Sequence, residues 1–180
     1  VTILHSCLNN RRVATIHGVM PKYFFDKKGI PTENLYTLIK LLSGQKVSYT
    51  IPGSKDNRPG KITGELAGGN LSIISSMFGT CCELDTKGKI LFIEDIDEFL
   101  YHADRMMHQL NMSGKLSKLA GLVIGNFSDM KDNESPFGKS IHEIISEAVR
   151  NYDYPVCFEF PGGHDEKNLA LAFGKTWNLE

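Results

Sequence analysis

From about residue 88 onward, continuous apolar runs alternate with stretches whose apolar residues recur at helical spacing. The runs at residues 88–98, 119–129 and 154–160 have the composition of buried strands. Between them, residues 98–116 and 140–152 place apolar residues three or four positions apart, as an amphipathic helix does. The order strand, helix, strand, helix, strand predicts an α/β fold with a largely parallel sheet.

Capping residues and apolar stripes define the predicted helices more closely. Ser140 and Glu143 have the spacing of a capping box, and Gly44 stands where a helix-ending glycine is favoured. Residues 1–10 and 31–44 are each predicted to form an amphipathic helix. The stripes expected to be buried are Ile3, Leu4, Cys7 and Leu8 in the first, Leu35, Leu38, Ile39 and Leu42 in the second, and Leu100, Met107 and Leu110 in the helix at 98–116.

The middle of the chain predicts strands and a turn. Residues 45–51 alternate apolar and polar side chains like a half-buried strand. Residues 61–80 predict a short strand, a turn at Gly68–Gly69, and a helix that Asn70 caps at its start.

Composition and charge exclude several classes of protein. The chain has 180 residues, 41% hydrophobic and 23% charged, which suits one soluble domain or one domain with part of another. The formal net charge of −1 gives no electrostatic reason to expect nucleic acid or an anionic membrane as a partner. No apolar run approaches the roughly 20 residues of a spanning helix.

The four cysteines do not have the spacing of a disulfide framework or of a zinc site. Cys81 and Cys82 are adjacent, Cys7 and Cys157 stand alone, and no CxxC pair occurs. We therefore expect reduced thiols, as in a cytosolic protein.

Polar side chains follow each of the three predicted strands directly. They are Glu94–Asp95, then Gly125–Asn126 with Ser128–Asp129 beyond, and Gly162–Gly163–His164–Asp165. The carboxyl ends of parallel strands meet at one edge of a sheet, so the three clusters are expected to lie together. A carboxylate beside a histidine there would form a general base with the partner that orients it. The alternative to a functional site is that these polar residues only mark the point where each strand reaches solvent.

The residues alone supply no nucleophile and no metal or nucleotide site. A GxSxG elbow, an HExxH pair and the glycine patterns of nucleotide-binding loops are all missing from the sequence. His102 and His108, six residues apart on a predicted helix, lie about 240° apart and are poor partners for a metal.

Six motifs together resemble one family. In order along the chain they are HGVMP, GGNLSIISSMFGT, GKILFIEDIDE, YHADRMMHQL, LAGLVIGNFSD and FPGGHDEKNLALAFG. The combination resembles the LD-carboxypeptidases, or muramoyltetrapeptide carboxypeptidases, over nearly the whole chain. The resemblance implies that residues 45–180 form the family's swivelling β/β/α-type C-terminal domain. Residues 1–44 would be a linker and a remnant of its flavodoxin-like N-terminal domain.

The resemblance also implies a Ser-Glu-His triad, with Glu94 and His164 as two of its members. The family's serine lies in a Gly-aromatic-Ser-Asp elbow that is followed by an aliphatic residue and a threonine. Those last two positions match Val1–Thr2, so the nucleophile is expected two residues before Val1. This chain alone is therefore expected to be inactive. Gly69, Asn70 and Gly163 are the expected substrate-binding residues.

The implied reaction is release of terminal D-alanine from a murein tetrapeptide during cytoplasmic peptidoglycan recycling. No metal or organic cofactor is implied, and family members resemble homodimers. Microcin-C self-immunity peptidases share the architecture and give an alternative substrate class. A non-catalytic binding domain is the third hypothesis, and the sequence leaves all three open.

Overall fold

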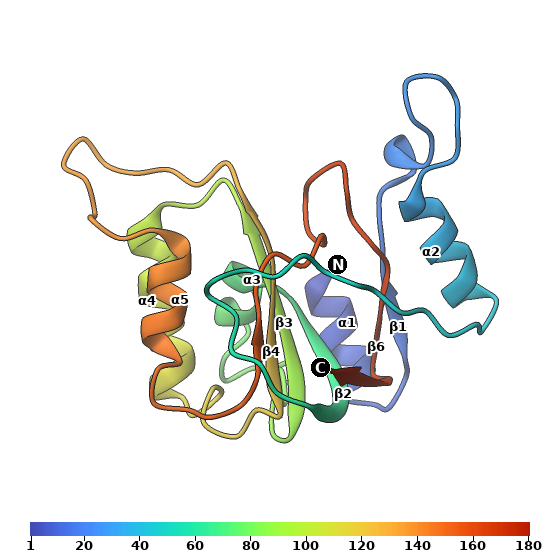
Figure 1. Cartoon of the computed structure of the whole chain (residues 1–180). Coiled ribbons are helices and arrows are strands. Elements are labelled where there is room, and N and C mark those ends of the chain that lie inside the picture. Colours follow the sequence, from blue (N-terminus) through green and yellow to red (C-terminus); the bar gives the residue numbers. More distant parts are fainter.

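The structure, a computed structural model, describes residues 1–180 as an α/β fold with one main sheet (Figure 1). The helices are α1 (Thr2–Asn9), α2 (Glu33–Leu42), α3 (Leu71–Ser76), α4 (Leu100–Met112) and α5 (Ile141–Ala148), with a 3₁₀ turn at Pro21–Tyr23. The strands are β1 (Thr15–His17), β2 (Ile62–Asn70), β3 (Lys89–Ile96), β4 (Gly121–Ser128), β5 (Val156–Cys157), β6 (Leu171–Phe173) and β7 (Thr176–Leu179).

The main sheet has the strand order β5-β4-β3-β2-β7. The pairs β2–β3, β3–β4 and β4–β5 are parallel, and only β7 is antiparallel to its neighbour β2. This confirms the predicted, largely parallel sheet. A second, two-stranded sheet pairs β1 with β6, two segments that lie far apart in sequence and that periodicity did not predict.

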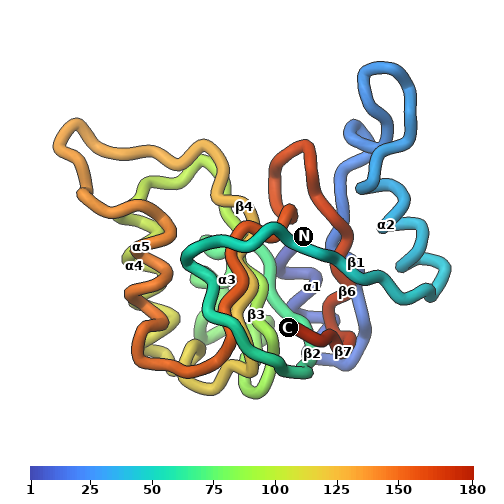
Figure 2. Tube along the Cα trace, in the orientation of Figure 1, coloured from blue at the N-terminus to red at the C-terminus, as the bar shows by residue number.

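Each face of the main sheet has its own hydrophobic core. On β3, Leu91 and Ile93 belong to the core beneath α3, α4 and α5, whereas Ile90 and Phe92 belong to the core on the other face. Successive residues of a strand point to opposite faces, so one continuous apolar run can supply both cores. Figure 2 shows α4 and α5 on one side of the sheet and α1, β1 and β6 on the other.

The helices covering the first core follow the predicted pattern. Asn70 caps α3 by accepting a hydrogen bond from the Ile73 N–H, and Ser140 with Glu143 forms the predicted capping box of α5. Met107 and Leu110 of α4 are buried as expected. None of the helices combines the length and the apolar character that crossing a membrane requires.

The two helices of the first 44 residues form where predicted, but they bury a different face. The buried residues of α1 are Thr2, His5, Ser6 and Asn9, and those of α2 are Asn34 and Thr37. Ile39 and Leu42 of the predicted stripe are 49% and 68% exposed. The burial prediction was wrong for Ile39 and Leu42, whereas Leu35 and Leu38 are half-buried. Periodicity shows which face of a helix is apolar, not which face meets another element.

Gly68 and Gly69 lie inside β2, so the turn predicted there was wrong. Their φ angles are 149° and 140°, which an L side chain rarely adopts. A Cβ on Gly68 would collide with the carbonyl oxygen of Phe92, and one on Gly69 would lie 2.6 Å from Thr2 Oγ1. The glycines therefore let β2 approach β3 and α1 closely instead of reversing the chain.

Two predicted strands are missing or short. Residues 45–51 form no strand, although Tyr49 and Ile51 still pack against the second core. The strand predicted at 154–160 is reduced to β5, because Glu159 has a φ of +62° and turns the backbone out of register.

The expectation of four reduced cysteines was wrong for two of them. Cys7 of α1 and Cys82, after α3, form a disulfide with a Cα–Cα distance of 4.7 Å across 75 residues of sequence. The same helix holds this segment through Ser6 Oγ, which donates to the Cys82 carbonyl, and Asn10 Nδ2, which donates to the Glu83 carbonyl. Sequence spacing cannot reveal such a pairing, because it depends on how α1 docks.

Replacing Gly68 with alanine is expected to destabilise the fold by about 3 kcal/mol or more, because the new Cβ meets the β3 backbone in an unfavourable conformation. Urea unfolding measures the loss. Gly53→Ala is the matched control, since nothing lies within 4 Å of its Cβ position. Equal stability of the two variants would contradict the close approach of β2 to β3.

Iodoacetamide applied to the folded protein without reductant is expected to label Cys81 first. Cys157 should react more slowly, because burial raises the pKa of its thiol. Cys7 and Cys82 should react only after reduction, and peptide mass spectrometry distinguishes the four sites. Labelling of Cys7 before reduction would show that the disulfide is absent.

Candidate active site

The three polar clusters that follow the strands meet at the carboxyl edge of β3 and β4. The Asn126 N–H donates to the Gly162 carbonyl at 2.8 Å, which attaches the glycine loop to the end of β4. The β3–β4 register shifts between Ile93 and Asp95, so Glu94 lies at an irregularity of the ladder. Such bulges re-aim side chains at the edge of a sheet.

Glu94 and His164 form a hydrogen-bonded pair at this edge. His164 Nδ1 lies 2.8 Å from Glu94 Oε2, although 70 residues separate them in sequence. The Glu94 side chain is 2% exposed, whereas that of His164 is 41% exposed. Burial raises the pKa of Glu94, and the neighbouring His164 opposes that rise. With Nδ1 bonded to Glu94, Nε2 remains free to exchange a proton with another group.

Glycines make the space in which this pair lies. Gly163 has a φ of 138°, and a Cβ there would lie 3.1 Å from Glu94 Oε2. A Cβ on Gly125 would collide with the Gly162 carbonyl oxygen. The glycine hinge therefore lets the backbone before His164 pass directly over the carboxylate.

The Asp95 carboxylate is hydrogen-bonded to residues of β2, α3 and its own strand, and not to His164. Its carboxylate accepts from Asn70 Nδ2 at 2.6 Å, from the Ser72 N–H at 2.9 Å and from the Ile96 N–H at 2.9 Å. Burial raises the pKa of Asp95, and these hydrogen bonds oppose the rise. The Asn70 side chain is thus fully engaged, because Nδ2 donates to Asp95 and Oδ1 caps α3 by accepting from the Ile73 N–H. Its backbone N–H donates to Thr2 Oγ1.

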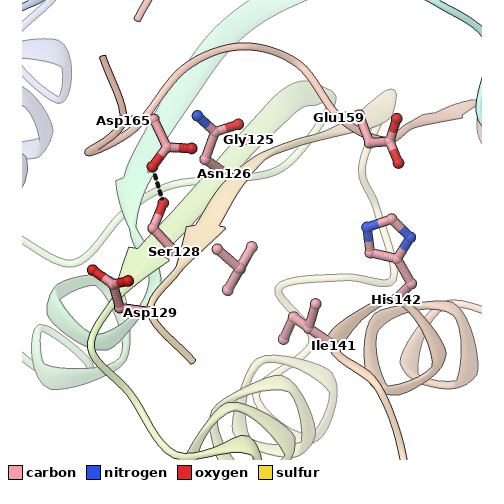
Figure 3. A pocket seen from close by; sticks show the side chains of 9 residues that line it. Gly125, Asn126, Ser128, Asp129, Ile141, His142, Glu159 and Asp165 are labelled. Atoms are coloured by element: carbon pink, nitrogen blue, oxygen red, sulfur yellow. Dashed lines mark hydrogen bonds between the residues drawn. The ribbon is translucent and has the colours of Figure 1, made fainter. Parts of the chain in front are cut away.

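A cavity of about 370 Å³ lies at the carboxyl end of β4 (Figure 3). Nine residues line it, namely Gly125, Asn126, Phe127, Ser128, Asp129, Ile141, His142, Glu159 and Asp165. Ser128 Oγ donates at 2.5 Å to Oδ1 of Asp165, the residue that follows His164. A Cβ on Gly163 would lie within 3.4 Å of both Glu94 and Asn126, so Gly163 is packed between the Glu94 carboxylate and a residue that lines the cavity.

Sequence reasoning missed several residues that shape this site. Thr2 Oγ1 of α1 accepts a hydrogen bond from the Asn70 N–H. The side-chain amides of Asn34 and Asn168 hold the loop that contains His164. His142 and Glu159 line the cavity. These contacts join residues far apart in sequence, and neither periodicity nor a short motif signals them.

Two further histidines are buried close to the pair. His5 Nδ1 lies 2.8 Å from Thr15 Oγ1, while the Nε2 atoms of His5 and His17 are buried without a hydrogen-bond partner. Burial, together with electrostatic repulsion from His5 and His164, lowers the pKa of His17 to about 4. Both rings pack against Phe173, which suits their neutral forms.

The arrangement can accept and return a proton at one exposed imidazole nitrogen. A buried carboxylate on the other ring nitrogen fixes the orientation of the ring, as in hydrolases with an activated hydroxyl nucleophile. No group of three or more His, Cys, Asp or Glu side chains is placed to bind a metal ion. The imidazole of His164 is hydrogen-bonded to Glu94 and to no serine or cysteine side chain.

Comparison with known proteins relates the chain to one family. The family model of the LD-carboxypeptidase C-terminal domain matches residues 63–179. A probable murein peptide carboxypeptidase of Bacillus subtilis is 33% identical over 177 residues, which cover 97% of this chain and 56% of that protein. The chain therefore spans a little over half the length of this relative.

Solved structures agree in fold. The muramoyltetrapeptide carboxypeptidase of Oxalobacter formigenes superposes with a TM-score of 0.80 at 28% identity, covering 98% of this chain and 61% of that one. The microcin C7 self-immunity protein MccF, in complex with aspartyl sulfamoyl adenosine, superposes with a TM-score of 0.81 at 19% identity. That match covers 99% of this chain and 62% of MccF, and it shows a shared fold only.

The buried His17 predicts a loss of stability in mild acid. Its pKa is lower in the folded than in the unfolded chain, so the stability from keeping it neutral is complete above about pH 6.5 and is lost as the pH falls toward 4. The loss approaches about 3 kcal/mol. Urea unfolding at pH 7, 5.5 and 4.5 measures it.

His17→Phe should flatten this pH dependence, and His108→Gln, at an exposed histidine, should not. Parallel profiles for the wild type and His17→Phe would contradict the assignment.

Proposed function

Because the chain belongs to the LD-carboxypeptidase family, we propose that it supplies the general base of a serine carboxypeptidase. The proposed reaction hydrolyses an L,D-peptide bond and releases the terminal D-alanine of a murein tetrapeptide. The observation that supports it most is the Glu94–His164 pair, a buried carboxylate on the ring of a half-exposed histidine at a sheet edge. The names of the relatives support the substrate class.

In the proposed mechanism, His164 Nε2 accepts the proton of a serine hydroxyl as the serine oxygen attacks the scissile carbonyl. Glu94 stabilises the imidazolium that forms, through the hydrogen bond to Nδ1. His164 then gives the proton to the amine of D-alanine, which leaves as the acyl-enzyme forms. A water molecule, deprotonated by the same nitrogen, hydrolyses the ester and restores the serine.

The serine is proposed to lie two residues before Val1, in a segment that precedes this chain. The position of α1 supports this placement, because Thr2 at its amino end contacts Asn70 beside the strand edge. His164 also lies close enough to His17 to lower its pKa, and the His17 ring packs against His5 of α1. The chain without that segment is proposed to be inactive.

Substrate contacts are proposed at Gly69, Asn70 and Gly163, where the backbone approaches Glu94 and α1 closely. Because the Asn70 side chain is occupied by Asp95 and by the start of α3, the contact proposed at Asn70 is made through its backbone. The adjoining cavity would take part of the peptide. No cofactor takes part in the proposed reaction.

A cytoplasmic homodimer acting in peptidoglycan recycling is the setting that the family resemblance suggests, and we propose it for the whole protein. The Cys7–Cys82 disulfide is unusual for that compartment, where thiols are generally kept reduced. Thiol labelling of protein taken directly from cells therefore bears on the proposed location.

Release of D-alanine from a murein tetrapeptide tests the proposal, using a protein in which this chain follows the upstream segment of its relatives. Glu94→Gln and His164→Ala should each lower kcat by about 10³-fold or more, because each removes the oriented base. His108→Gln, which removes an exposed histidine paired with Asp104, should leave kcat unchanged.

Turnover of an aminoacyl sulfamoyl nucleoside without release of D-alanine would instead favour a substrate like that of the MccF complex. Full activity in both site variants would exclude the pair as the base. A folded protein inactive on both substrates would favour a binding domain.

A further inference from the structure

The loop that holds His164 connects the segment beside β4 with β6. Its last backbone hydrogen bond to β4 is the one that the Gly162 carbonyl accepts from the Asn126 N–H. The Leu169 N–H donates to the Pro161 carbonyl at 2.8 Å and closes the neck of the loop. The remaining backbone groups of the loop need side-chain partners, because buried backbone groups are costly to leave unpaired.

Asn168 supplies partners inside the loop. Its side-chain Nδ2 donates to the Gly163 carbonyl at 2.6 Å, and its Oδ1 accepts from the Gly163 N–H at 3.3 Å. One buried amide thus holds both backbone groups of the residue directly before His164. The position of the imidazole therefore depends on the position of Asn168.

Asn34, in the first turn of α2, fixes Asn168 from outside the loop. Its Oδ1 accepts from the Asn168 N–H at 2.9 Å, and its Nδ2 donates to the Glu166 carbonyl at 2.7 Å. Thr37, on the same face of α2, accepts from the Ala170 N–H at 3.2 Å. Asn34 and Thr37 are the buried residues of α2, whereas Ile39 and Leu42 on the same helix are largely exposed.

This burial pattern explains why α2 turns polar residues inward. A helix that only covered a core would bury its apolar stripe. Here the buried amide and hydroxyl satisfy backbone groups of an irregular loop, across more than 130 residues of sequence. The buried face of α2 is built to hold that loop.

We propose that Asn34 is a positioning residue for the catalytic base, acting on His164 through Asn168 and Gly163. The inference rests on the proposed function for the identity of the reaction, but the geometry of the loop can be tested without it. Loss of Asn34 would release Asn168, and Gly163 would no longer hold the imidazole on Glu94. A displacement of about 1 Å at a catalytic group can lower the rate about 10²-fold.

The variants Asn34→Ala and Asn34→Asp test this inference. Asn34→Asp keeps an acceptor for the Asn168 N–H but places an oxygen against the Glu166 carbonyl in place of a donor. Lys167→Met is the matched control, because it removes only the exposed ion pair with Glu33 between the same loop and helix. Circular dichroism confirms that each variant is folded.

In the protein with the upstream segment, both Asn34 variants should lower kcat about 10- to 100-fold with little change in KM. In the 180-residue chain, ¹⁵N-edited NMR should show the Nδ1–H signal of His164 in the wild type. In both Asn34 variants this signal should be lost to exchange with water. Lys167→Met should change neither result. A folded Asn34→Ala that keeps both kcat and this signal would overturn the inference.

The two measurements separate the inference from the proposed function. If the wild type releases no D-alanine, the proposed reaction fails, and the NMR signal alone decides whether Asn34 positions His164. If neither Asn34 variant folds, Thr37→Val, which removes the acceptor of the Ala170 N–H, takes their place. It should give a smaller change in the same direction, and no change in either readout would overturn the inference.

Discussion

The hydrogen bond between the buried Glu94 and His164 is the interaction on which the rest of the site depends. A carboxylate removed from water is costly unless a partner compensates it. Here the carboxylate lies at the end of a central strand, and the compensating imidazole arrives on a loop from 70 residues away. The loop can approach so closely only because Gly163 carries no side chain. The sheet fixes the carboxylate, the glycine hinge places the imidazole on it, and the imidazole remains 41% exposed.

Much of the fold could be predicted from the sequence, because its signals are local. The apolar runs of β3 and β4 and the capping residues Asn70, Ser140 and Glu143 depend on neighbours within a few positions. Errors arose where a local pattern does not determine which other element packs against the segment. The glycines of β2 mark a close approach to β3 and α1 instead of a turn. In α1 and α2 the apolar face was identified, but other elements pack against the polar face.

The same distinction applies to the site. Glu94 and His164 were predictable because both follow strands whose carboxyl ends share one edge, so topology alone brings them together. Asn34, Asn168 and Thr2 were not, since a buried amide or hydroxyl has no periodicity and its partner lies far away in sequence. The Cys7–Cys82 disulfide belongs to the same class. The residues proposed to act chemically stand at recognisable places in this fold, whereas the residues that hold them in position are found only in three dimensions.

The central claim is that Glu94 fixes one tautomer of His164, with the proton on Nδ1 and Nε2 free to act as a base. The hydrogen bond from Nδ1 to the Glu94 carboxylate determines which ring nitrogen carries the proton. ¹⁵N NMR of the ring observes the position of that proton directly. For the neutral imidazole in the wild-type chain, the account predicts a protonated Nδ1 and an unprotonated Nε2. A ring protonated at Nε2, or one that averages between the two forms like free histidine, would contradict it.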